Sequence, residues 1–213
     1  MRIPQPEGLK GSLKWIQKAI ETAPQCVQPA SLPQINWTSP IRADEFAEYR
    51  DIGFLSAIGQ PLLGDSLRLF WPSRGPQWDA LGTFDGGVVL VEAKAHIAEF
   101  LTPASGASAS SLEKIQQALS STQEYLNASQ NVAWERTYYQ YTNRLAHLYF
   151  LRKHGVNAHL IFVSFLNDVE MNGPMLSETW EAAFQAANYS LGIPKRHKLS
   201  KYIHHRFPDV TSL

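Results

Sequence analysis

Residues 78–96 read WDALGTFDGGVVLVEAKAH, and this stretch decides the fold of the chain. Asp85-Gly86 stands between two apolar runs, where Asp-Gly is a strong signal for a two-residue β-hairpin turn. We expect a type I′ turn, in which both central residues have positive φ. Counting outward from this turn places Asp79 directly opposite Glu92 on the neighbouring strand. The predicted arms of the hairpin are Trp78–Phe84 and Gly87–His96.

The acidic pair formed by Asp79 and Glu92 indicates a bound cation. Like charges on directly opposed residues repel each other, because their Cβ atoms lie about 5 Å apart. Lys94 lies two residues beyond Glu92 and therefore points to the same side of the sheet. Carboxylate oxygens are the ligands that Mg²⁺ prefers, with water and substrate phosphate completing its coordination shell. The pattern predicts a divalent-metal site at which Lys94 counters developing negative charge.

The rest of the pattern predicts an α/β fold, in which helices flank a mixed central β-sheet. Residues 1–40 are predicted to form an N-terminal helix and a proline-rich connector (23–40) that pack on the core, and residues 41–213 a single domain. Helices are expected over 9–22, 43–58, 110–127, 137–154 and 177–189, and further strands over 66–71 and 158–165.

Composition narrows the class of protein. The 213 residues include 19 Lys and Arg against 19 Asp and Glu, so bulk electrostatic attraction to nucleic acid or membrane is not expected. No apolar run is long enough to cross a bilayer, and Cys26 is the single cysteine, so we expect a cytoplasmic protein without a membrane partner. Segment 195–207 is basic and aromatic, and contact with phosphate and a solvated surface are equally good explanations for it.

An acidic residue, a hairpin and then Glu92-Ala93-Lys94 at the end of an apolar strand resemble the PD-(D/E)XK nuclease superfamily. The resemblance covers residues 41–166, although Trp78 stands where the family's name has proline. It implies a restriction-endonuclease-like core with Mg²⁺ or Mn²⁺ as cofactor. The implied activity is hydrolysis of phosphodiester bonds in nucleic acid, DNA in preference to RNA.

The resemblance also implies an acidic residue outside the hairpin, because such enzymes often place one on their first helix. Glu48 is the choice here and Glu45 is the competitor. Glu48 could instead form a salt bridge with Arg50 or Arg42. The predicted metal ligands are Asp79, Glu92 and Glu48.

Some branches of the family place a glutamine on the helix before the last core strand. Gln140 matches that position and completes the predicted catalytic set, with Gln116 and Gln117 on the preceding helix as rivals. The same helix carries Asn143, Arg144 and His147 on nearby faces.

Two alternatives stay open. If Gly86-Gly87 forms the turn, Asp79 faces Lys94 and the two form an ordinary cross-strand salt bridge. The alternative function is a catalytically inactive module that binds nucleic acid or protein on the same fold. A homodimer is compatible with either function, since many nucleases of this type cut both strands as dimers.

Overall fold

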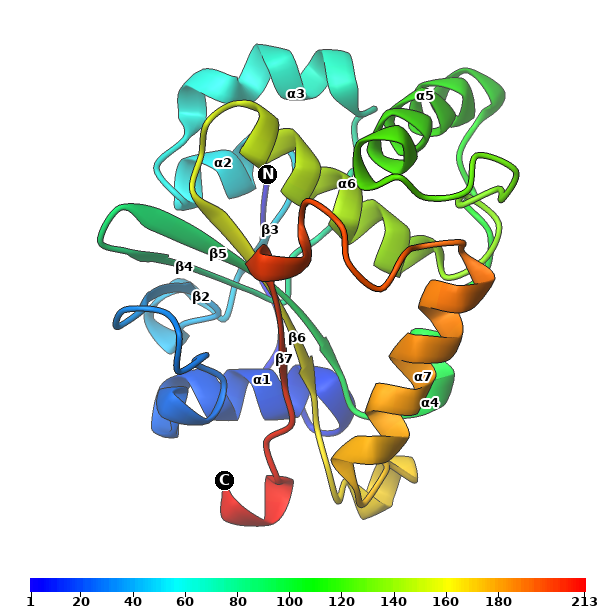
Figure 1. The fold of residues 1–213 in the computed structure, drawn as a ribbon. Helices are drawn as coiled ribbons and strands as arrows, with labels where there is room; N and C mark the ends of the chain where they lie inside the picture. Colours follow the sequence, from blue (N-terminus) through cyan, green and yellow to red (C-terminus); the bar gives the residue numbers. More distant parts are fainter.

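The computed structural model describes all residues 1–213 and shows a five-stranded sheet with helices on both faces (Figure 1). Its strands, in spatial order, are β2 (Asn36–Ser39), β4 (Ala80–Phe84), β5 (Gly87–Lys94), β6 (Ala158–Ser164) and β7 (Ile203–Arg206). The pairs β2–β4 and β4–β5 are antiparallel, whereas β5–β6 and β6–β7 are parallel. The prediction of an α/β fold with a mixed, helix-flanked sheet is confirmed.

The helices divide between the two faces of the sheet. Helix α1 covers one face, and α2, α3, α5 and α6 cover the other (Figure 1). A separate two-stranded sheet pairs β1 (Arg2–Ile3) with β3 (Glu48–Tyr49). No helix combines the length and the apolar character that crossing a lipid bilayer requires. The helices are α1 (Gly11–Thr22), α2 (Ile52–Ala57), α3 (Gly64–Phe70), α4 (Ile97–Phe100), α5 (Ala109–Leu126), α6 (Tyr139–Lys153) and α7 (Ser177–Ser190).

The predicted hairpin has the expected position and register. Phe84 pairs with Gly87 and the ladder continues outward to the pair of Ala80 and Val91, so a turn at Gly86-Gly87 is excluded. The turn type differs from the prediction, because only the second loop residue, Gly86, has positive φ (77°). The ladder ends at the pair of Ala80 and Val91, so Asp79 directly precedes β4, and its side chain accepts a hydrogen bond from the backbone N–H of Ala93, next to Glu92 on β5.

Strand β5 supplies both apolar cores because its side chains alternate between the two faces. Val89 and Val91 pack in the core beneath α1, whereas Val88 and Leu90 pack in the core beneath α6. Glu92 and Lys94 continue the alternation of Leu90 and therefore reach the face that α6 covers. They do so at the carboxyl end of the strand, which is where ligands bind in α/β sheets.

The prediction of one helix over residues 43–58 is wrong. A 3₁₀ turn (Arg42–Asp44), strand β3 and the short helix α2 occupy this stretch. Positive φ angles at Glu45 (53°) and Asp51 (52°) break the helical path. Glu48 therefore lies on a strand and not on a helix.

Three further predictions need correction. Residues 66–71 were predicted as a strand but lie in helix α3 or directly after it. The prediction failed because the apolar alternation of so short a run fits one helical turn as well as a strand. The proline-rich connector contributes strand β2, and the basic tail contributes strand β7. Residues 1–40 contribute apolar side chains to the core beneath α1 and also supply one edge strand of the central sheet.

Replacing Gly87 with alanine is expected to destabilise the fold. An added Cβ would lie 2.1 Å from Cζ of Phe84 and 2.7 Å from the carbonyl oxygen of Asn157. Overpacking of this kind should lower the free energy of unfolding by about 2 kcal/mol, measured by urea denaturation. Gly106→Ala is the matched control, because no atom lies within 4 Å of its added Cβ. Equal stability of the two variants would contradict the tight packing behind the turn.

Candidate active site

A cavity of about 490 Å³ opens at the carboxyl end of β5. Strands β3 and β5, the loop before β4, helix α4 with the segment after it, and the start of α6 all contribute to its wall. The wall includes every residue of the predicted catalytic set: Asp79, Glu92, Lys94, Glu48 and Gln140. The structure therefore brings together residues that lie up to 92 positions apart between Glu48 and Gln140.

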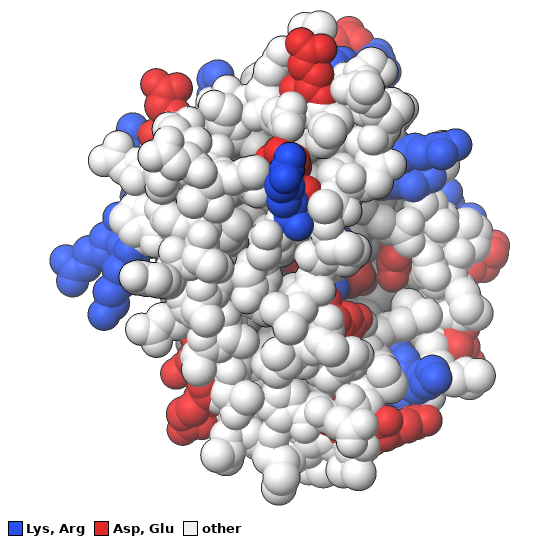
Figure 2. Space-filling model, turned by 90° about the vertical axis from the view of Figure 1, so that its right-hand side faces the viewer, with Lys and Arg blue, Asp and Glu red and all other residues white.

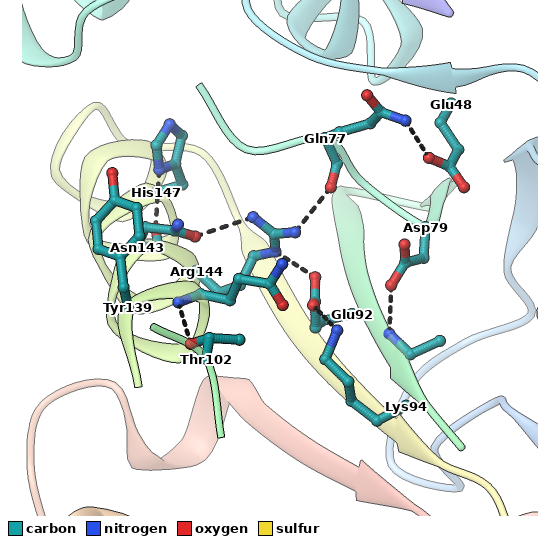
Figure 3. A network of polar contacts seen from close by, with 12 residues as sticks. Glu48, Gln77, Asp79, Glu92, Lys94, Thr102, Tyr139, Asn143, Arg144 and His147 are labelled. Carbon is teal, nitrogen blue, oxygen red and sulfur yellow. Dashed lines mark hydrogen bonds and ion pairs between the residues drawn. The ribbon is translucent and has the colours of Figure 1, made fainter. Parts of the chain in front are cut away.

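Glu92 is the centre of a polar network in this cavity (Figure 3). Nζ of Lys94 lies 2.6 Å from one of its oxygens, and Nε of Arg144 lies 2.5 Å from the other. All three side chains are buried. Burial by itself raises the pKa of Glu92, but the charges of Arg144 and Lys94 outweigh it and lower that pKa. Glu92 is therefore an ionised carboxylate with a cation at each oxygen.

Asp79 is oriented by the strand next to it. Its Oδ2 accepts a 2.6 Å hydrogen bond from the backbone N–H of Ala93, and no protein donor reaches its Oδ1. Burial and then the charge of Glu92 raise the pKa of Asp79 well above its usual range. A cation at the free oxygen would relieve both effects, because it favours the ionised form.

Glu48 reaches the cavity because β3 lies beside the start of the hairpin. The backbone N–H of Trp78 donates a 3.1 Å hydrogen bond to the carbonyl of Tyr49, which neighbours Glu48 on β3. Oε2 of Glu48 accepts a hydrogen bond from the Gln77 side chain at 2.5 Å, and no protein donor reaches Oε1. Burial, with a further contribution from the charge of Glu92, raises the pKa of Glu48.

Glu45, the alternative to Glu48 as the third acidic residue of the site, lies too far from the cavity to belong to it. Glu45 is exposed over 71% of its side chain and pairs with Arg2 at 3.3 Å, away from the cavity. The arginines that could have paired with Glu48 are engaged elsewhere, Arg42 with Glu7 and Glu21 and Arg50 near Asp51.

Gln140 lines the cavity with an amide oxygen that is buried and has no hydrogen-bond partner. Its backbone N–H donates to Oγ1 of Thr102 at 3.0 Å, which fixes the start of α6 to the segment after α4. The rivals Gln116 and Gln117 are exposed on α5 and do not line the cavity.

Arg144 is a member of the site that the sequence analysis named only as a neighbour of Gln140. Besides Glu92, its guanidinium donates to the carbonyl of Gln77 at 2.8 Å and to Oδ1 of Asn143 at 2.9 Å. It also lies 4.7 Å from the ring centre of Trp78. The available signal was its place one helical turn after Gln140 on a helix otherwise rich in apolar residues.

His147, one turn further along α6, is a packing residue. It is 1% exposed, and its Nδ1 contacts the carbonyl oxygen of Asn143 at 2.9 Å. Burial lowers the pKa of His147 to about 3, so the ring is neutral. It does not line the cavity.

The residues present fit a hard divalent ion, although no three His, Cys, Asp or Glu side chains form a ready ligand cluster. Asp79 and Glu48 each offer one oxygen without a protein donor, and Gln140 offers an unpartnered amide oxygen. Oxygen donors of this kind suit Mg²⁺ or Mn²⁺, which leave other coordination positions to water or phosphate.

Charge is concentrated inside the site and sparse around it. The cavity wall carries the acids Glu48, Asp79, Glu92 and Glu99 and the cations Arg74, Lys94 and Arg144. Figure 2 shows one face of the molecule on which most of the surface is uncharged and acidic and basic atoms lie together in a hollow. Any attraction of a charged ligand would therefore be local, and not the effect of a broad basic surface.

Comparisons with protein-family models, with curated proteins and with solved structures found no match to this chain. By its fold and site, the chain is an α/β protein with a buried cluster of carboxylates and cations in a cavity at the carboxyl end of a central strand.

Replacing Asp79 with asparagine is expected to stabilise the fold. Asparagine keeps an acceptor for the N–H of Ala93 but removes a carboxylate whose ionisation the fold disfavours. The free energy of unfolding at pH 7 should rise by about 1 kcal/mol, measured by urea denaturation.

The pH dependence of this gain provides its check. Because the pKa of Asp79 is raised in the folded protein, ionisation penalises the fold only above the unfolded pKa of about 3.9. The difference between variant and parent should therefore be absent below that pH and grow as the pH rises. Asp85→Asn, at the exposed turn, is the control and should show no such growth. A pH-independent difference at position 79 would contradict the raised pKa.

Proposed function

We propose that this protein is a metal-dependent phosphodiesterase that hydrolyses the backbone of DNA, in preference to RNA, on a restriction-endonuclease-like core. One observation carries the proposal: Asp79, directly before β4, and Glu92, on the paired strand β5, line one cavity with Lys94 and Glu48, and Asp79 and Glu48 each have an oxygen without a protein donor. Element order adds support, because the hairpin is followed by helices and then by β6, parallel to β5.

Asp79, Glu48 and Glu92 are the residues that would hold Mg²⁺ or Mn²⁺. The bound ion would polarise the phosphate and acidify an attacking water. The free oxygens of Asp79 and Glu48 would bind it directly, whereas Glu92 would have to share an oxygen with Lys94 or Arg144. The Gln140 amide oxygen could accept a hydrogen bond from a water or a substrate group.

Lys94 acts as a cationic donor in this proposal and not as a general base. Burial by itself lowers the pKa of Lys94, but the charges of Glu92, Asp79 and Glu99 outweigh it and raise that pKa. The ammonium group therefore keeps its proton at neutral pH. From its place beside Glu92 it can donate hydrogen bonds to a phosphate oxygen on which negative charge develops.

A second candidate function is a non-catalytic module that binds nucleic acid or protein. The observation that favours it is that both carboxylate oxygens of Glu92 already contact a cation of the protein, which leaves neither of them free for a metal ion. In such a module the network would serve only to stabilise the fold, and the cavity would bind no ion.

Replacing Asp79 or Lys94 with alanine is expected to lower DNA cleavage by at least about 100-fold, because the first variant loses a ligand of the ion and the second loses a donor to the developing charge. Cleavage of labelled DNA and of RNA of the same sequence would be measured with Mg²⁺, with Mn²⁺ and with EDTA, and circular dichroism would verify folding. Glu45→Gln, which alters the exposed rival acid, should leave cleavage unchanged. Full activity in a folded Asp79→Ala protein would refute the proposed nuclease.

A manganese titration separates the nuclease from the non-catalytic module. The nuclease should bind Mn²⁺ at a site that Glu92→Gln weakens strongly, because the substitution removes a ligand charge. Isothermal titration calorimetry at fixed pH provides the measurement. Absence of Mn²⁺ binding both with and without DNA would favour the module.

A further inference from the structure

Counted with every carboxylate ionised, as the ligands of a bound ion are, the cavity holds one more negative than positive charge. The carboxylates of Glu48, Asp79 and Glu92 face the two buried cations Lys94 and Arg144. The wall also contains Glu99 and Arg74, one group of each sign, which leave this balance unchanged. Net charge in a site with low exposure is costly, so the balance governs which ligands bind together.

Arg144 is fixed in the cavity wall by several contacts within the protein. Its Nε, Nη1 and Nη2 each donate to a different partner, on β5, on α6 and on the loop before β4. The Trp78 ring covers its guanidinium. A guanidinium cannot lose its charge in a protein, so Arg144 is a permanent positive charge beside Glu92.

We propose that Arg144 makes metal binding depend on the phosphate of the substrate, an inference that rests on the proposed function. A divalent ion alone would turn the single negative charge of the cavity into a single positive one. One phosphodiester anion, added with the ion, makes the cavity neutral. Ion and phosphate therefore bind cooperatively, and each raises the affinity for the other by the same factor.

Arg144 is a positioning residue in this scheme, because it acts through Glu92 and through the charge of the cavity. If its charge is removed, the ion alone neutralises the cavity and no longer needs the phosphate. Arg144→Gln makes this change and keeps an amide that can donate to Glu92 or to the Gln77 carbonyl. Arg144→Lys keeps the charge and loses the planar fork, so it should retain the dependence on phosphate.

The experiment measures Mn²⁺ affinity by electron paramagnetic resonance, with and without a short DNA duplex. A phosphorothioate duplex keeps the backbone charge and resists hydrolysis, and a methylphosphonate duplex of the same sequence carries no backbone charge. In the parent protein the phosphorothioate duplex should tighten Mn²⁺ binding by about tenfold or more, and the methylphosphonate duplex should have no effect. Arg144→Gln should bind Mn²⁺ alone about tenfold more tightly than the parent, with little further gain from either duplex.

Controls separate this inference from the proposed function. Arg136→Gln, an exposed arginine outside the cavity, should behave as the parent does. Mn²⁺ binding that Glu92→Gln abolishes but that neither duplex changes would overturn the inference and leave the nuclease standing. An Arg144→Gln protein with the parent's dependence on phosphate would also overturn it. Absence of Mn²⁺ binding under every condition would refute both proposals. If Arg144→Gln does not fold, the parent and Arg144→Lys titrations with the two duplexes decide.

Discussion

Glu92 forms ion pairs with Lys94 and Arg144, and the rest of the structure depends on these two contacts. An isolated carboxylate in so buried a place would cost several kcal/mol, and loss of one partner would leave an uncompensated charge. Arg144 comes from α6 and also donates to the Gln77 carbonyl, so helix, central strand and the loop before the hairpin meet at one point. The wall of the cavity is built around that point.

Several groups of the site lower the free energy of unfolding of the protein. Burial raises the pKa of Asp79 and of Glu48, and each of these groups uses only one oxygen in hydrogen bonds within the protein. The buried amide oxygen of Gln140 has no partner. A protein core normally pairs such groups, and their accumulation in one cavity is typical of a site that binds a ligand.

Local rules predicted the hairpin well, because one Asp-Gly turn and a period of two residues determine which side chains face each other. They therefore placed Asp79 against Glu92 and Lys94 on the same side. The same rules failed for Glu48, whose strand is only two residues long and follows backbone with positive φ that no periodicity reveals. Arg144 was missed as a partner of Glu92 because 52 residues separate the two in the sequence, and only the packing of α6 brings them together.

Strand β2 forms one edge of the sheet, and its position limits how far the chain can be shortened from its N-terminus. Because residues 36–39 pair with β4, and α1 covers the core beneath β5, the folded unit includes the first forty residues. A protein that began at residue 41 would leave the hydrogen-bonding groups of β4 that face β2 without partners and expose Val89 and Val91 to solvent. Unpaired strand edges beside apolar surface promote intermolecular strand pairing, so such a truncation would favour aggregation over a smaller active domain.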